Sequence, residues 1–332
     1  MNRRTVARSF VVTALLAVVG SAGCIGSSDP AEARVDGLRR AVPSKESIQI
    51  RLPGAEPAEG SASDGLGSAE QALVGEKAKL YVMTRDISQA VNTAAWAWLG
   101  LIEDIAAQPP TQASDDKALW GPHTPALSLV TYVFVVEKTG DDSYQYALEG
   151  KVKNQGDDAY VPIVYGTSQP GDSTNGSGTM VLDFGARHGL DPTLPEQGTI
   201  GFAYGDAGTQ WVLDMAFDGF VDGDGQGPYD ALYHYREHAD QSGDFAFFTQ
   251  SDIDDNGSAL ETWLMRSRWL GGGSGRSDVQ IAGGDLGAVT VVASECWDEM
   301  FARTYWAVDP GYLDPPEGSP DACVFAFADP DA

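Results

Sequence analysis

The chain has 332 residues, and its 48 Asp and Glu against 21 Lys and Arg give a net charge of -27. Such an acidic chain repels phosphate backbones, which excludes nucleic-acid binding as a function class. Hydrophobic residues make up 42% and aromatic residues 10% of the chain, enough to fill a core, so wholesale disorder is excluded as well. The 39 Gly and 18 Pro favour many turns and short strands over a helix bundle.

The first 23 residues are typical of a signal peptide. Arg3, Arg4 and Arg8 form a positive region, residues 10–19 an apolar region, and residues 20–23 a small-residue cleavage site. An apolar stretch of about ten residues is too short for a permanent transmembrane helix. We therefore predict export followed by cleavage.

The cleavage region ends at a cysteine. Ser21-Ala22-Gly23-Cys24 resembles the lipobox of bacterial lipoproteins, whose cysteine is acylated and becomes the mature N-terminus. Ser21 stands where the lipobox usually has Leu, so plain secretion with cleavage near Ala22 is the alternative. Ile25 after the cysteine resembles an outer-membrane sorting signal. We expect a lipid anchor at Cys24 in the cell outer membrane, with a secreted or soluble periplasmic protein as the alternative.

Two cysteines remain once Cys24 is assigned to the anchor. Cys296 and Cys323 form an even pair in an exported chain, so we predict that they form a disulfide. Two buried free thiols are the alternative.

Three regions follow the signal peptide. Residues 24–45 are mostly small, charged or Pro residues without an apolar period, which predicts a flexible tether. Residues 46–332 are expected to form a single β-rich domain. Within it, Ile48, Ile50 and Leu52 alternate with polar residues and predict a short strand.

One amphipathic helix is expected at about residues 72–107. Its apolar positions recur in steps of three, four or seven, and Pro109 and Pro110 prevent its continuation. Acidic and basic side chains along it argue against a membrane span.

Alternating runs separated by turn residues follow Pro122. Residues 132–136 and 144–148 alternate on either side of Gly140-Asp141-Asp142, which predicts a hairpin. Further runs to about residue 293 predict ten to twelve antiparallel strands in a meander. We therefore predict a mainly β, α+β fold, in which a large curved sheet or half-barrel packs around the long amphipathic helix.

Several strings of residues resemble a known group of proteins. They are Asn92, Pro109-Pro110-Thr111, Trp120-Gly121-Pro122, residues 144–150, Ser267-Arg268-Trp269, Gly275-Arg276-Ser277-Asp278 and Glu295-Cys296-Trp297-Asp298. Together, from about residue 73 onward, they resemble uncharacterised lipoproteins encoded in delta-proteobacterial genomes. The resemblance implies an envelope address and no assigned activity.

The most catalytic-looking string runs from His234 to His238 and fits the H-x-x-E-H pattern of inverted zinc peptidases. Zinc binding there requires a helix that brings both imidazoles onto one face. The surrounding residues predict a strand, on which the two side chains are about 13 Å apart. We therefore predict that this pair binds no zinc.

Asp252, Asp254 and Asn256, followed by Gly257, begin like a calcium loop, but the acid required at position twelve is replaced by Trp263. A hairpin turn that needs no metal is our prediction, and these three residues are the weak calcium candidates. Residues 222–225 offer a weaker version of the same pattern.

Residues 271–276 are rich in Gly but lack the Lys-Ser/Thr ending of a phosphate loop and no helix pattern follows, so they predict a turn. No cofactor is expected, and whether the protein is an enzyme stays open.

The combined prediction is a membrane-held envelope protein with a non-enzymatic binding or structural role. An apolar ligand between the helix and the sheet is one form of that role, by analogy with half-barrel lipoprotein carriers. The alternative is an envelope hydrolase with a metal or carboxylate site. Protein partners and oligomeric state stay undefined.

Overall fold

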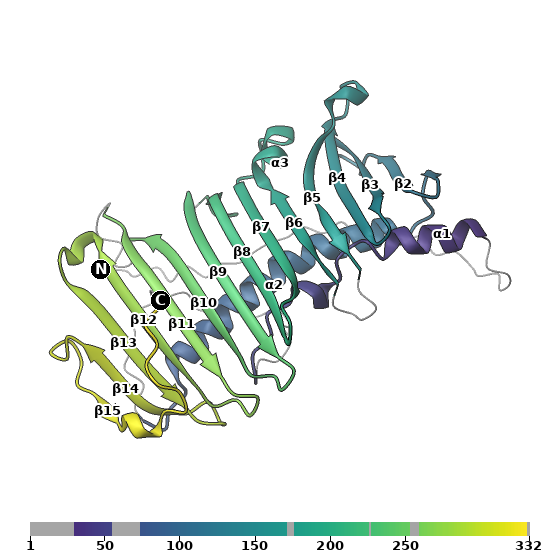
Figure 1. Cartoon of the computed structure of the whole chain (residues 1–332). Helices are drawn as coiled ribbons and strands as arrows, with labels where there is room; N and C mark the ends of the chain where they lie inside the picture. The colour runs from purple at the N-terminus through teal and green to yellow at the C-terminus, as the bar shows by residue number, and fades with distance from the viewer. Residues whose placement is uncertain (1–29, 55–73, 171–175, 226, 253–258, 331–332) are drawn as a thin grey trace.

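A computed structural model describes residues 30–54, 74–170, 176–225, 227–252 and 259–330. Its main element is one sheet of fifteen strands, paired in chain order and antiparallel at every described pairing (Figure 1). The strands are β1 (Gln112–Ala113), β2 (Lys117–His123), β3 (Val130–Gly140), β4 (Ser143–Val152), β5 (Val161–Gln169), β6 (Ser177–Asp183), β7 (Gln197–Asp206), β8 (Gln210–Val221), β9 (Tyr229–His238), β10 (Gly243–Ser251), β11 (Glu261–Trp269), β12 (Gly275–Gly283), β13 (Thr290–Trp297), β14 (Arg303–Asp309) and β15 (Glu317–Gly318). The predicted antiparallel meander is confirmed, and the sheet is open, with β1 and β15 at its two ends.

The meander follows from alternating sequence and short turns. In the predicted hairpin, β3 pairs with β4 from Val130 opposite Val152 to Gly140 opposite Ser143. The sequence missed β2 and β14, as well as the two-residue strands β1 and β15. Strand β2 contains Gly121-Pro122, and its register with β3 shifts between Trp120 and His123, so the period-two pattern is interrupted there.

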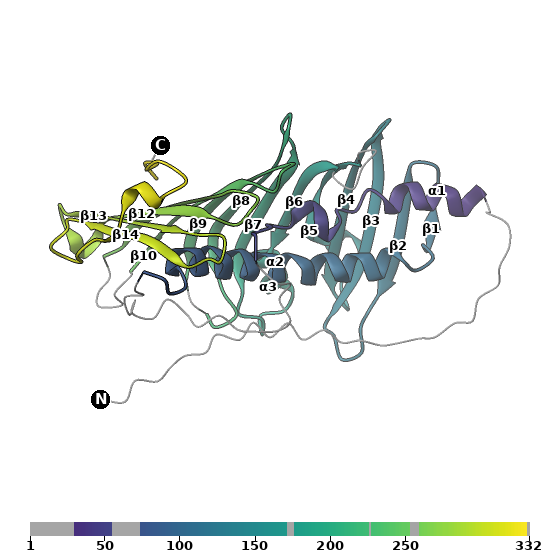
Figure 2. The same cartoon turned by 90° about the horizontal axis from the view of Figure 1, so that it is seen from below.

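Helix α2 (Lys79–Ala106, 28 residues) lies along one face of the sheet (Figures 1 and 2). It contacts β11, β12 and β13 as well as β3, so it crosses the strands rather than running beside one of them. A helix of this size is about 42 Å long, close to the roughly 43 Å that separates β3 from β12 at normal strand spacing. The face covered by α2 is called the inner face, and the opposite face the outer face.

The hydrophobic core lies between α2 and the inner face. Side chains alternate along each strand, and in β11 the inward positions include Trp263, Met265 and Trp269, all buried. From α2, Leu99 and Ile102 have no exposed surface and belong to the same apolar cluster. This packing explains why most tryptophans are core residues.

The prediction of a flexible tether over residues 24–45 is wrong for its second half. Helix α1 (Pro30–Arg39) packs against β2 and β3. Val35 and Leu38 are buried, and Arg39 Nε donates to the carbonyl oxygen of Ala106 at the end of α2, 2.7 Å away. Too few apolar residues occur in this charged stretch to produce a periodic pattern, so its order depends on tertiary contacts.

The strand predicted at Ile48–Leu52 is also wrong. A 3-10 turn, η1 (Lys45–Ile48), precedes an extended segment that pairs with none of the described strands. Instead, Asn92 of α2 accepts from the amide of Ile50 and donates to its carbonyl oxygen, both at 2.9 Å. The alternating residues are buried, but against the helix and the inner face, so burial here did not require a strand ladder.

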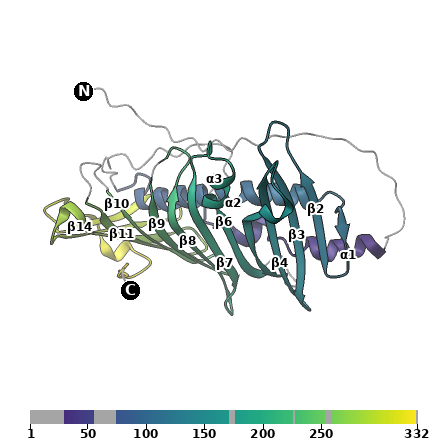
Figure 3. The same ribbon diagram turned by 90° about the horizontal axis from the view of Figure 1, so that it is seen from above.

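The sheet ends in very short strands. β1 and β15 have two residues each, which leaves little regular edge for pairing with another chain. Helix α3 (Phe184–Leu190), capped by Asp183, lies in the connection between the paired strands β6 and β7 (Figure 3). No described helix has the length and hydrophobicity of a membrane span.

Candidate binding site on the outer face

Alternation along β11 and β12 sends serine inward and arginine outward. On the inner face, Ser267 Oγ lies 2.6 Å from Thr84 Oγ1 of α2 and donates to Ser277 Oγ at 2.9 Å. The neighbouring positions therefore point to the outer face, where Arg268 of β11 lies directly opposite Arg276 of β12. Like charges facing one another across two strands are unfavourable, so these arginines need compensating contacts.

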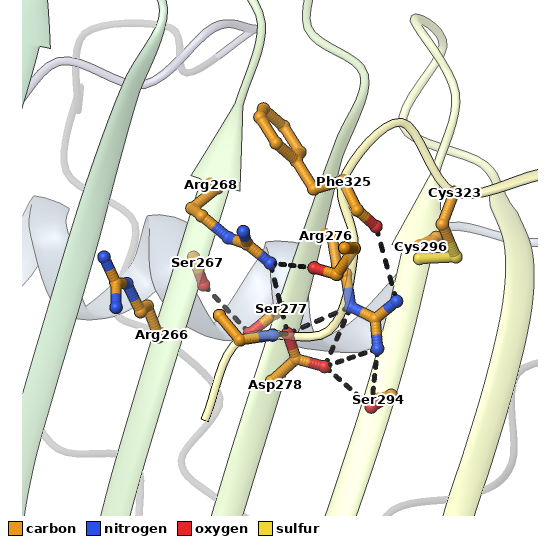
Figure 4. A network of polar contacts seen from close by, with 12 residues as sticks. Arg266, Ser267, Arg268, Arg276, Ser277, Asp278, Ser294, Cys296, Cys323 and Phe325 are labelled. Carbon is orange, nitrogen blue, oxygen red and sulfur yellow. Dashed lines mark hydrogen bonds and ion pairs between the residues drawn. A yellow bond between two sulfur atoms is a disulfide. The ribbon is translucent and has the colours of Figure 1, made fainter. Parts of the chain in front are cut away.

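Asp278 supplies part of that compensation. It is fully buried, and its two oxygens accept from Arg276 Nε at 2.9 Å each. Ser294 of β13 donates to the same carboxylate at 2.7 Å, and Arg268 Nη2 is 3.5 Å from it. One carboxylate thus holds side chains from three strands together (Figure 4).

The end of the chain supplies the rest. Residues 319–330, called the C-terminal strap here, lie over the outer face of β12 and β13. Arg268 Nη2 donates to the carbonyl oxygen of Ala326, and Arg276 Nη1 to that of Phe325 at 3.4 Å. The amide of Ala328 donates to Asp278 Oδ2 at 3.2 Å. The strap therefore places backbone acceptors on both guanidinium groups.

Two aromatic rings add to these contacts. The ring of Phe325 lies 5.1 Å from the guanidinium of Arg268, and that of Phe327 lies 5.6 Å from the guanidinium of Arg276. Burial lowers the pKa of Arg268. The Asp278 carboxylate opposes this effect, while Arg266 and Arg276 add to it. Arg268 Nε is buried and has no hydrogen-bond partner among the described residues.

The predicted disulfide is confirmed. Cys296 of β13 and Cys323 of the strap are bonded, with their Cα atoms 5.4 Å apart, inside the range that a disulfide allows. Cys296 lies directly opposite Arg276 in the sheet. The covalent link therefore fixes the strap beside the arginine pair (Figure 4).

A groove opens along the strap. Its volume is about 810 Å³, and it is bounded by strands β12 to β14 on one side and by the strap on the other. Its lining combines polar groups with apolar ones, and includes Arg276, Ser294, Tyr305, Asp309, Phe325 and Phe327. An arginine, a hydroxyl and aromatic rings in one groove can hold a ligand that has both an anionic and an apolar part.

A second buried charge cluster lies on the inner face. Glu295 and Arg303 are almost fully buried, and Arg303 Nε donates to Glu295 Oε1 at 2.6 Å. The carboxylate also accepts from the amides of Lys79, at 3.0 Å, and Leu80. Since Ala78 gives α2 no side-chain cap, Glu295 of the sheet caps the helix. Burial raises the pKa of Glu295, which Arg303 and the two amides oppose.

The predicted strand position of the histidine pair is confirmed. His234 and His238 both lie in β9, and His234 Nδ1 contacts Asp214 Oδ1 on the neighbouring strand β8. Both members of that contact are largely exposed, with side-chain exposures of 41% and 56%. The described ranges hold no group of three or more His, Cys, Asp or Glu residues arranged to bind a metal. The helix that an H-x-x-E-H site requires is not formed here.

The loop candidates have separate outcomes. Asp254 and Asn256 lie outside the described residues, so the turn predicted there stays a prediction, and Asp252 directly follows β10. At the weaker site, Asp222 accepts from the amide of Asp224 at 3.0 Å and from that of Gly225 through its carbonyl oxygen at 2.9 Å, which forms a turn. The turn predicted at residues 271–276 joins β11 to β12 and is confirmed, although its last two residues, Gly275 and Arg276, already belong to β12.

Known proteins give no further guidance. No family model, curated protein or solved structure matches this chain.

The sequence analysis placed Arg268 and Asp278 only in strings that carry a resemblance, placed Arg276 also in the Gly-rich string 271–276 that lacks the ending of a phosphate loop, and assigned none of the three a role. A usable signal was present. In a strongly acidic chain, arginines at positions 266, 268 and 276 occupy alternate places on two adjoining strands. That these arginines share the outer face of the sheet follows only from the pairing register of the two strands.

Proposed function

We propose that the protein is a non-enzymatic binding protein of the cell envelope, held at the membrane by a lipid on Cys24, and that the groove beside the strap receives its ligand. The observation that carries this proposal is the groove itself. Its volume of about 810 Å³ lies within the range of small-molecule sites, which are roughly 300–1,000 Å³. Arg276 and the rings of Phe325 and Phe327 give it one charged and one apolar region.

The packing between α2 and the sheet also favours the outer groove as the ligand site. It is occupied by side chains of the protein, including Leu99, Ile102 and Trp269, and by the segment that Asn92 holds. An apolar ligand at that place would have to displace the helix. The outer groove binds a ligand without such a rearrangement.

Burial of the charged groups also favours binding over hydrolysis. Glu295 and Arg303 join the sheet to α2, and Arg276 and Asp278 join it to the strap. Each pair therefore connects two elements of the fold. Hydrolysis would need a carboxylate or imidazole that faces a substrate, rather than one that joins two elements of the fold.

The anchor gives the domain an orientation. Only residues 25–29 separate Cys24 from α1, and five residues reach at most about 20 Å. Because α1 packs on β2 and β3, that end of the sheet would lie near the membrane. The groove, at β12 to β14, would lie near the far end of α2, distant from the lipid surface.

The groove is tested with 1-anilinonaphthalene-8-sulfonate, which has an anionic group and an apolar ring system. We expect saturable binding to the oxidised protein, weakened at least tenfold by Ala307→Trp, which fills the groove. Ala216→Trp is the matched control, because Ala216 is exposed on the outer face of β8. Equal affinity in the protein and in Ala307→Trp would show that the groove is not the site.

The anchor is tested by partitioning into detergent. The unmodified protein should enter the detergent phase, whereas Cys24→Ser should stay in the aqueous phase with an unchanged melting temperature. If both stay aqueous, cleavage near Ala22 and plain secretion are the better description.

A further inference from the structure

The strap contacts the arginine pair as a ligand would. Two consecutive carbonyl oxygens, those of Phe325 and Ala326, accept from Arg276 and Arg268 respectively. Guanidinium groups that converge on two neighbouring oxygens are the usual way in which proteins bind carboxylate and phosphate groups. The backbone of residues 325 and 326 occupies the position that such an anion would take.

The site also has more donors than the strap uses. Arg268 Nη2 and Arg276 Nη1 are occupied by the strap, while Arg268 Nε is buried and has no partner in the part of the chain that is described. The strap thus satisfies two of these three donors and leaves Arg268 Nε without an acceptor. A phosphate group offers more than two acceptor oxygens. Its negative charge would also offset the repulsion between the two facing arginines.

The local charge favours an anion despite the acidic chain. On the outer face of β9 to β12, the row formed by Arg236, Asp244, Arg268 and Arg276 is paired strand to strand. The adjoining row carries Arg266 opposite Asp278. Arg236 and Asp244 neutralise one another as an ion pair, and Arg266, Arg268 and Arg276 then outnumber Asp278 by two. Removing the strap would expose this excess of positive charge to solvent.

We propose that the C-terminal strap is a built-in substitute ligand, and that reduction of the Cys296–Cys323 disulfide releases it so that Arg268 and Arg276 bind a phosphate group. This inference rests on the proposed binding role of the groove and adds to it a ligand class and a control. Arg276 lines the groove as well as the covered site, so release of the strap would join the two into one larger surface.

The release step is thiol–disulfide exchange with a dithiol. A thiolate of the dithiol attacks one sulfur of the Cys296–Cys323 bond, which breaks and leaves a mixed disulfide. The second thiol of the reductant resolves that intermediate. The protein gains two electrons and two protons as two thiols, and the dithiol is oxidised to a disulfide. Cys323 lines the groove, which gives the reductant a path of approach.

The test is titration with inorganic phosphate at neutral pH, followed by calorimetry, on the oxidised protein and on protein reduced with dithiothreitol. We expect reduction to tighten phosphate binding at least tenfold. Arg268→Gln should abolish the gain. Arg236→Gln is the matched control, because Arg236 lies on the same face and is paired with Asp244 rather than covered by the strap; this variant should retain the gain.

A second variant covers the case in which the strap stays seated after reduction. Cys296→Ser and Cys323→Ser combined with Phe325→Ala and Phe327→Ala remove both the covalent link and the two rings. Failure of this variant to bind phosphate would overturn the proposal, as would equal binding by the oxidised protein or an equal loss in Arg236→Gln.

A further arm separates free phosphate from lipid headgroups. The reduced protein is mixed with vesicles of phosphatidylcholine and phosphatidylglycerol. Since the groove would lie at the end of the sheet distant from the membrane, we expect binding of inorganic phosphate without vesicle binding that depends on Arg268. Vesicle binding without phosphate binding would contradict the assignment of a soluble ligand. These readings are independent of dye binding to the oxidised protein, so loss of the groove and loss of the strap mechanism give different results.

Discussion

The two faces of strands β11 to β13 bury charge in different ways. On the inner face, Glu295 binds Arg303 and the first amides of α2, inside a continuous core. On the outer face, Arg276 and Asp278 are almost as buried, but the segment that lies over them is the strap. The same strands therefore carry one charge cluster that is part of the core and one that a single segment encloses.

The comparison shows that burial by itself does not define a structural role. Removing the inner cluster would uncouple α2 from the sheet, because Glu295 is the cap of that helix. Removing the outer cover would expose two arginines and leave α2 in place. Four predictions test this difference, and the largest expected effect comes first.

Glu295→Ala should have the largest effect on stability. It leaves Arg303 buried without its carboxylate and leaves two amides of α2 without an acceptor, so we expect a loss of about 3–5 kcal/mol in the free energy of unfolding. Urea denaturation measures the loss. Asp214→Ala, which breaks the exposed contact with His234, should change stability by less than about 1 kcal/mol. A small effect of Glu295→Ala would mean that the cap is unimportant.

Loss of the disulfide should have an intermediate effect. The bond closes a separation of 27 residues, and the chain-entropy model gives about 3.5 kcal/mol for such a loop. Cys296→Ser with Cys323→Ser should therefore lower the free energy of unfolding by roughly 2–4 kcal/mol. The same denaturation curve is expected for the unmodified protein under reducing agent. A midpoint that neither change alters would show that the bond does not constrain the fold.

The hydroxyl chain on the inner face should contribute less. Ser267→Ala removes the partner of both Thr84 and Ser277, and we expect a cost of about 1–3 kcal/mol. Ser168→Ala is a suitable control, since its buried hydroxyl has no hydrogen-bond partner among the described residues. That substitution should be close to neutral. Equal costs at the two serines would argue against the hydroxyl chain as a contributor.

Local pattern and cysteine pairing predicted a good part of this fold. The alternation on either side of Gly140 and the even pair Cys296 and Cys323 each specified a contact that the structure contains. These features depend on residues close in sequence or on a unique chemical partner. The open shape of the sheet and its full number of strands required the pairing itself.

Other elements could not be read from local pattern. The alternating residues Ile48, Ile50 and Leu52 are buried but form no strand, and Asn92 of a distant helix takes the place of a neighbouring strand. The strap was missed for a similar reason. Its contacts with the arginines are made by the backbone carbonyl oxygens of Phe325 and Ala326. Every residue has a carbonyl oxygen, so no side-chain pattern predicts these contacts.

Amide hydrogen exchange in the oxidised and reduced protein tests the central claim most directly. The amide of Ala328 donates to Asp278 beneath the strap, and that of Leu80 donates to Glu295 at the start of α2. The account predicts that reduction speeds exchange at Ala328 at least tenfold and leaves Leu80 unchanged. Equal acceleration at both amides, or none at Ala328, would contradict a strap whose position over a stable core depends on the disulfide.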